Sequence, residues 1–151
     1  MGTLKDLLTA DLRNAMKARD ELITSTLRMA LAAVGTAEVA GDVKRELSDE
    51  EVVTVLTKEA KKRREAAAAF SGAGRADQAA RETAEGEVLE RYLPKQLSDA
   101  ELADLVRQAL AAGHLRGAAQ MGPAMKAAQA VVAGRADGAR VAAEVRRQLA
   151  L

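Results

Sequence analysis

Positively charged side chains are the most conspicuous chemical feature of this 151-residue sequence. Five of them fall in the run K-E-A-K-K-R-R, from Lys58 to Arg64. Consecutive residues of a helix are about 100° apart, so these cations cannot all share one face. Lys58 and Lys62 can line one side with Lys61 and Arg64 beside them, which would make an anion-binding stripe. The alternative is a solvated helix face, paired through neighbouring glutamates at helical spacing.

A second candidate anion site lies in the tail, in M-G-P-A-M-K from Met121 and G-R-A-D-G from Gly134. Each segment places a helix N-terminus beside glycine, where free backbone N–H groups and the helix dipole can hold a phosphate. Lys126, Arg135 and Arg140 would add positive charge nearby. The alternative is that these glycines merely let short helices pack and turn. The residues alone leave both interpretations open.

The sequence shows no recognisable catalytic or metal-binding motif. It has no Walker A, G-x-S-x-G or G-x-G-x-x-G pattern, and no nucleophile with a base beside it, so we predict neither catalytic residues nor a cofactor. Cysteine is absent and the only histidine, His114, falls in a predicted turn, so we predict no metal site. The only aromatic residues are Phe70 and Tyr92, which disfavours base stacking on single-stranded RNA. An RNA partner would therefore be recognised through its shape and phosphates.

The composition is typical of a helical protein of the cytoplasm. Hydrophobic residues make up 48% of the chain, and nearly half of them are alanine, which favours helices and lets them approach closely. The absence of cysteine fits a reducing compartment. No apolar run is long enough for a signal peptide or a membrane span. We therefore predict a cytoplasmic protein that makes no membrane contact.

The net charge of +1 conceals an uneven distribution of charge. Residues 105–151 hold seven basic and two acidic side chains, whereas residues 1–104 hold 16 basic and 20 acidic ones. Division at residue 97 gives a smaller contrast, because three acids lie in the first turns of the helix that follows. A basic tail surface suggests an anionic partner, and ordinary charge scatter on a small domain is the alternative.

The elements that must position these residues are all helices. Hydrophobic periodicity and capping signals predict seven of them, at about 3–19, 20–39, 48–70, 77–93, 98–112, 122–132 and from 137 onward. Ser48 and Ser98 each precede a glutamate by three residues, the spacing of a capping box. Pro94 should stop the fourth helix just before it. We therefore predict an all-α fold, with an N-terminal antiparallel bundle over residues 1–94 and a small three-helix domain over residues 95–151.

Several segments together resemble the YqeY family, also called GatB/YqeY domain proteins. In order, they are L-R-M-A-L-A-A-V from Leu27, L-S-D-E-E-V-V from Leu47, K-E-A-K-K-R-R-E-A-A from Lys58, V-L-E-R-Y-L-P-K-Q-L-S from Val88, and the two tail segments M-G-P-A-M-K and G-R-A-D-G. Each segment alone is a weak signal. Their order and spacing make the resemblance specific, and it covers nearly the whole chain.

The resemblance implies an all-helical protein whose small C-terminal domain is similar to the tail of the B subunit of glutamyl/aspartyl-tRNA amidotransferase. That enzyme amidates mischarged tRNA with ammonia from glutamine, and its tail helps to hold the tRNA. The YqeY family accordingly carries the label of a carbon–nitrogen ligase with glutamine as amide donor. The matching tail positions, in a tRNA-contact or tail-fold role, are Gly122, Met125, Lys126, Gly134, Arg135 and Asp137.

We therefore expect a tRNA-binding accessory protein related to this amidotransferase that is not catalytic alone. Its candidate tRNA site consists of the six tail positions and Arg140. The basic stripe at Lys58, Lys61, Lys62 and Arg64 is a secondary candidate. The alternative is a protein-interaction module that docks on an amidotransferase or aminoacyl-tRNA synthetase subunit. A third hypothesis, an amidotransferase-type enzyme, predicts amidation by the purified chain that depends on glutamine and ATP.

Overall fold

The computed structural model describes residues 2–151, and over this range it contains seven α-helices, one short 3-10 helix and no strand. The predicted all-α fold class is confirmed. The chain divides into two compact units, unit 1 (Met1–Leu93) and unit 2 (Pro94–Leu151). No helix within residues 2–151 combines the length and the apolar character needed to cross a bilayer.

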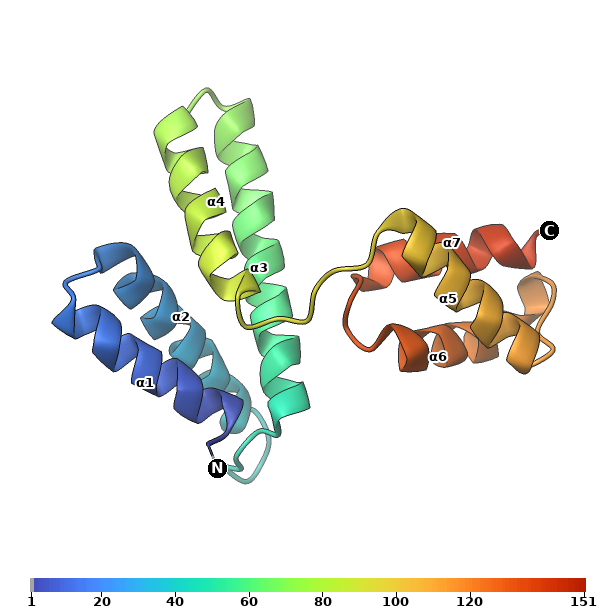
Figure 1. Cartoon of the computed structure of the whole chain (residues 1–151), viewed down its shortest axis with the longest axis horizontal. Coiled ribbons are helices and arrows are strands. Elements are labelled where there is room, and N and C mark those ends of the chain that lie inside the picture. The colour runs from blue at the N-terminus through green and yellow to red at the C-terminus, as the bar shows by residue number, and fades with distance from the viewer. Residues whose placement is uncertain (1) are drawn as a thin grey trace. The chain divides into compact units, whose positions relative to one another are not determined.

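Unit 1 consists of two antiparallel helical hairpins (Figure 1). The first pairs α1 (Leu4–Lys17) with α2 (Glu21–Glu38), and the second pairs α3 (Asp49–Gly72) with α4 (Ala76–Glu90). Aliphatic side chains from all four helices meet in one core, whose fully buried leucines are Leu8, Leu27, Leu56 and Leu89. None of residues 61–85 is buried, so the second hairpin extends beyond this core.

Unit 2 is a three-helix unit that also contains a 3-10 turn. Its elements are α5 (Asp99–Ala112), η1 (Ala118–Gln120), α6 (Met121–Val132) and α7 (Gly138–Leu149). The largest fully buried side chains of its core are valines, whereas those of unit 1 are leucines; the valines are Val106, Val132, Val141 and Val145. Leu97, which precedes α5, joins this core, and its backbone N–H donates to the carbonyl of Arg135 at 2.7 Å.

Short-range signals in the sequence set the starts of most helices. Ser48 caps α3 and Ser98 caps α5, each in a complete capping box, as their spacing predicted. Thr3, Asp20 and Asp137 cap α1, α2 and α7 with their side-chain oxygens. These oxygens accept from N–H groups that have no partner inside the helix, and loss of such a cap typically costs about 1 kcal/mol.

Several helix boundaries differ from the prediction by one to three residues, and the end of α4 and the start of α6 show why. Helix α4 ends at Glu90 rather than Leu93, because the N–H groups of residues 91–93 bond to carbonyls three residues back and so tighten the last turn. Tyr92 lies in this turn, partly buried against the core of unit 1. Helix α6 begins at Met121, directly after η1, rather than at residue 122, so Pro123 occupies its third position. Proline is tolerated there because N–H groups of the first turn lack a partner within the helix.

Candidate nucleic-acid interface

Two residues of the predicted tail site lie on the exposed face of α6. Gly122 and Lys126 are exposed, whereas Ala124 and Ala128 on the opposite face are fully buried. A Cβ atom placed at Gly122 would meet nothing within 4 Å, so the backbone there is open to a partner. Lys126 has no acidic partner within residues 2–151. This face of α6 therefore presents one unneutralised cation beside accessible backbone.

Arg135, in the turn between α6 and α7, is used inside unit 2. Its Nε donates to the carbonyl of Val132 at 3.0 Å, and its Nη2 donates to the carbonyl of Val131 at 2.8 Å. Both carbonyls belong to the last turn of α6, where C=O groups have no partner within the helix. The guanidinium group of Arg135 thus caps the C-terminus of α6.

Arg140 joins α7 to the segment that enters α5. Its Nη2 donates to the carbonyl of Leu97 and to Oδ1 of Asp99, both at 2.9 Å. Its backbone N–H donates to Oδ1 of Asp137 at 2.9 Å. The carboxylate of Asp137 therefore occupies the position at the N-terminus of α7 where a bound phosphate would accept the same hydrogen bond.

Gly134 and Met125 contribute to the fold of unit 2. Gly134 has a φ of +79°, in the left-handed region that favours glycine, and it follows Ala133 at +49°. Met125 is partly buried and packs against the core of unit 2. Of the seven predicted tail residues, Gly122, Lys126 and Gly134 are exposed, Met125 packs against the core, and Arg135, Asp137 and Arg140 make hydrogen bonds within unit 2.

All five acidic side chains of unit 2 have hydrogen-bond partners within that unit. The partners are Arg140 for Asp99, Arg107 and Gln108 for Asp104, Arg147 and Gln148 for Glu144, and backbone N–H groups at helix starts for Glu101 and Asp137. Hydrogen bonds from Ser98 and from Arg147 hold the pKa of Glu101 and of Glu144 below its ordinary value. Arg116 and Arg146, like Lys126, are exposed and have no acidic partner within the described residues.

The secondary basic stripe lies on the exposed side of α3, and its four residues are Lys58, Lys61, Lys62 and Arg64. Lys62 pairs with Glu59 at 3.3 Å. Arg64 pairs with Glu90 of α4 at 3.5 Å. The other two lysines have no acidic partner in the part of the chain that the structure describes. Two of the four cations are therefore paired, as expected for a solvated helix face, and the other two are available to an anion.

Comparison with models of known protein families identifies the family of this chain. The family model described as Yqey-like protein matches residues 5–149. The chain belongs to the YqeY family. No curated protein shows a significant match to it. The family match confirms the resemblance predicted from the sequence, and it covers both the tail cations and the basic stripe.

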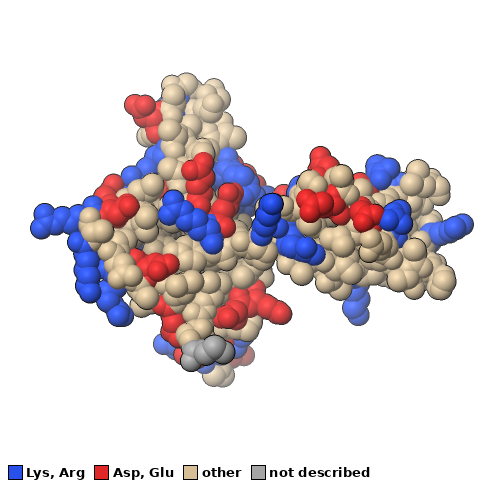
Figure 2. Space-filling view, viewed as in Figure 1, with Lys and Arg blue, Asp and Glu red and all other residues tan. Residues whose placement is uncertain are grey.

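Sequence reasoning missed a third basic cluster of this YqeY protein, at the free end of the α1–α2 hairpin. Arg13, Lys17 and Arg19 are all exposed there and have no acidic partner within residues 2–151. Figure 2 shows Lys and Arg side chains gathered at this end of unit 1. The spacing of Arg13 and Lys17, one turn apart on α1, could have been recognised in the sequence. Arg19 lies after the end of α1, in a turn where its φ is +58°, and the sequence did not indicate that position.

Proposed function

We propose that this YqeY protein binds tRNA through the exposed cations of unit 2 and acts as an accessory RNA-binding protein. The charge balance of unit 2 supports this most strongly. Residues 94–151 hold eight basic and five acidic side chains, and every one of those acids has a partner within the unit. Cations that are not neutralised internally are available to phosphates, whose contacts supply much of the affinity for nucleic acid.

The side chains of unit 2 favour a folded RNA over a single strand. Residues 94–151 contain no aromatic side chain, so unit 2 cannot stack unpaired bases on aromatic rings. Phosphate contacts from Lys and Arg can still follow the shape of a double-helical arm. The resemblance of the tail to that of the amidotransferase B subunit makes tRNA the specific candidate.

The predicted tail residues take two different roles in this proposal. Lys126, together with Arg116 and Arg146, contacts phosphates directly, because these side chains are exposed and have no acidic partner among the described residues. Arg135 and Arg140 act indirectly, because their guanidinium groups hold the α6–α7 turn and the start of α5 in place. Their replacement is expected to weaken RNA binding only as far as it loosens unit 2.

The test is binding of the purified full-length chain to total tRNA, at low and at near-physiological salt, with duplex DNA as competitor. We expect saturable binding that survives both the salt and the competitor. Binding that disappears at near-physiological salt, or that duplex DNA matches, would contradict the proposal and indicate a merely basic surface.

A further inference from the structure

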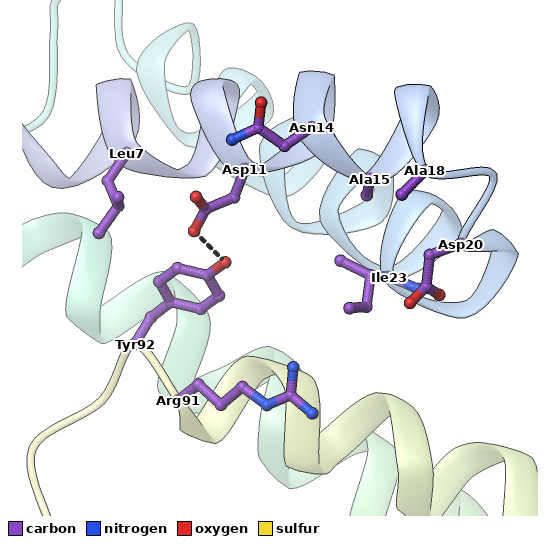
Figure 3. A pocket seen from close by; sticks show the side chains of 9 residues that line it. All are labelled: Leu7, Asp11, Asn14, Ala15, Ala18, Asp20, Ile23, Arg91 and Tyr92. Carbon is purple, nitrogen blue, oxygen red and sulfur yellow. Dashed lines mark hydrogen bonds between the residues drawn. The ribbon is translucent and has the colours of Figure 1, made fainter.

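Unit 1 contains a groove that takes no part in the proposed RNA site (Figure 3). It lies between one side of α1, the start of α2 and the end of α4, and it has a volume of about 550 Å³. Along α1 it extends from Leu7 to Ala18. At 1.5 Å per residue this is about 16 Å, or roughly three helical turns.

Tyr92 holds the two sides of the groove together. Its hydroxyl donates to Oδ2 of Asp11 at 2.6 Å, and this hydrogen bond joins residues 81 positions apart (Figure 3). Burial, and then the bond to Asp11, raise the pKa of Tyr92 well above its ordinary value, so the hydroxyl keeps the proton that it donates. The bond fixes the end of α4 against α1, and the groove is therefore formed before any partner arrives.

An apolar strip runs along the groove. Leu7 is 49% exposed, although its neighbour one residue along, Leu8, is fully buried in the core of unit 1. Ile23 and the ring of Tyr92 are partly buried and line the same space. Apolar surface that faces a concave, preformed site gains free energy when a partner covers it.

Charged groups of opposite sign stand on the two walls of the groove. Asp11 and Asp20 line the α1–α2 side, and each has one carboxylate oxygen with no hydrogen bond inside residues 2–151. The Arg91 side chain extends into the groove from the end of α4 (Figure 3), and it has no partner among the described residues. A ligand must therefore present positive charge to the wall that carries Asp11 and Asp20, and an apolar surface to the strip between the two walls.

These features select one kind of ligand. The two carboxylates would repel the phosphates of RNA, so the groove is not an extension of the proposed RNA site. An open groove three turns long would leave much of a small molecule exposed, whereas small-molecule pockets usually bury most of their ligand. A helix laid along a groove instead uses apolar anchors spaced one turn apart and charged residues beside them.

We propose that this groove docks a short amphipathic helix of a partner protein. An apolar side chain of that helix packs between Leu7 and Tyr92, and a lysine or arginine of the helix faces Asp11. The inference is independent of RNA binding, because it uses residues of unit 1 alone.

The experiment uses a display library of helical peptides of about 14 residues, or roughly 20 Å of helix, selected on the full-length chain. We expect the selected peptides to share an apolar residue with a lysine or arginine one helical turn away. Leu7→Ala should weaken their binding about tenfold. Met16→Ala is the matched control, because Met16 is also on α1 and equally exposed at 49% but does not line the groove. It should change binding less than twofold.

A second pair of variants tests the charge on the acidic wall. Asp11→Asn removes one charge but keeps an oxygen that can accept from Tyr92, and it should weaken binding about fivefold. Asp42→Asn makes the same charge change at an exposed loop position outside the groove and should have no effect. Circular dichroism checks that all four variants remain folded.

Three results would overturn the proposal. The first is a selection that yields no peptide dependent on Leu7, and the second is equal weakening by Leu7→Ala and Met16→Ala. The third is displacement of the bound peptides by tRNA, which would place the groove within an RNA surface. Failure of tRNA binding in a separate assay would leave the peptide result unaffected.

Discussion

Unit 1 and unit 2 differ in which charged side chains they leave without an internal partner among the described residues. In unit 2 every acid has an internal partner, and Arg135 turns back onto backbone carbonyls, so the charge left outside is positive. In unit 1 charges of both signs lack an internal partner among the described residues, such as Arg13 and Lys17 on the surface and one oxygen of Asp11 in the groove, although Arg63 is held between helices by Glu82. The contrast shows that the number of charges in a segment does not predict its partner. What matters is which charged side chains the fold leaves without an internal hydrogen-bond or ion-pair partner.

The largest expected effect is a loss of stability in unit 2 when Arg140 is replaced by alanine. The variant removes the donor to the carbonyl of Leu97 and the contact with Asp99. A hydrogen bond to a charged group is worth about 1.5–3 kcal/mol, and because the Asp99 end is exposed we expect a loss near the lower value. Faster amide hydrogen exchange in α5 and α7 would report it.

Arg146→Ala is the control for this prediction. Arg146 is also on α7 but is exposed and has no internal partner among the described residues, so its replacement should change stability by less than about 0.5 kcal/mol. Equal effects of the two variants would break the distinction between internal and available arginines.

A second prediction concerns the groove of unit 1 and alkaline pH. Tyr92 is the only tyrosine and the chain has no tryptophan, so tyrosinate absorbance reports this residue alone. Its raised pKa predicts that the folded protein shows little tyrosinate at pH 10, the ordinary pKa of the group. Asp11→Asn should lower the pKa of Tyr92, because the negative acceptor is lost while burial remains. If Tyr92 of the wild-type protein titrates around pH 10, this hydrogen bond does not hold the two sides of the groove together.

A smaller effect is expected at acid pH in the cap of α3. The hydrogen bond from Arg45 lowers the pKa of Glu51 from 4.5 to about 2 in the folded state. The stability that this carboxylate contributes is therefore fully present above pH 4.5 and is lost as the pH falls towards 2. Glu51→Gln keeps a side-chain oxygen for the capping box and should flatten the pH dependence of thermal unfolding in this range. An unchanged profile would show that the Arg45–Glu51 pair is not maintained in solution.

The helices of this protein were predictable from its sequence because their signals are local. The serines of the two predicted capping boxes act within a few residues of themselves and cap α3 and α5 as predicted, and Gly134 lies in a turn, which was one of its two interpretations. The end of α4 was misplaced because Pro94 excludes helix only at the residue before it, whereas the tightened turn at residues 91–93 leaves the α-helix earlier.

The candidate sites were less predictable because their contacts span long distances in the chain. The exposure of Lys126 follows from the buried alanines on the other face of α6. The internal role of Arg140 depends on Leu97, 43 residues away, and no local sequence pattern predicts this contact. The groove depends on Tyr92 meeting Asp11, which are 81 residues apart.

We propose that the exposed cations of unit 2, and not those of unit 1, bind tRNA. Lys126→Ala and Lys61→Ala test it most directly, because each removes an exposed helical lysine without an acidic partner among the described residues. The measurement is the tRNA affinity of each variant across a range of salt concentrations. We predict that Lys126→Ala weakens binding and reduces the slope of log affinity against log salt by about 0.7–0.9, as expected for one lost phosphate contact, while Lys61→Ala leaves both unchanged. A reduced slope for Lys61→Ala with an unchanged one for Lys126→Ala would contradict the account and move the RNA surface to α3.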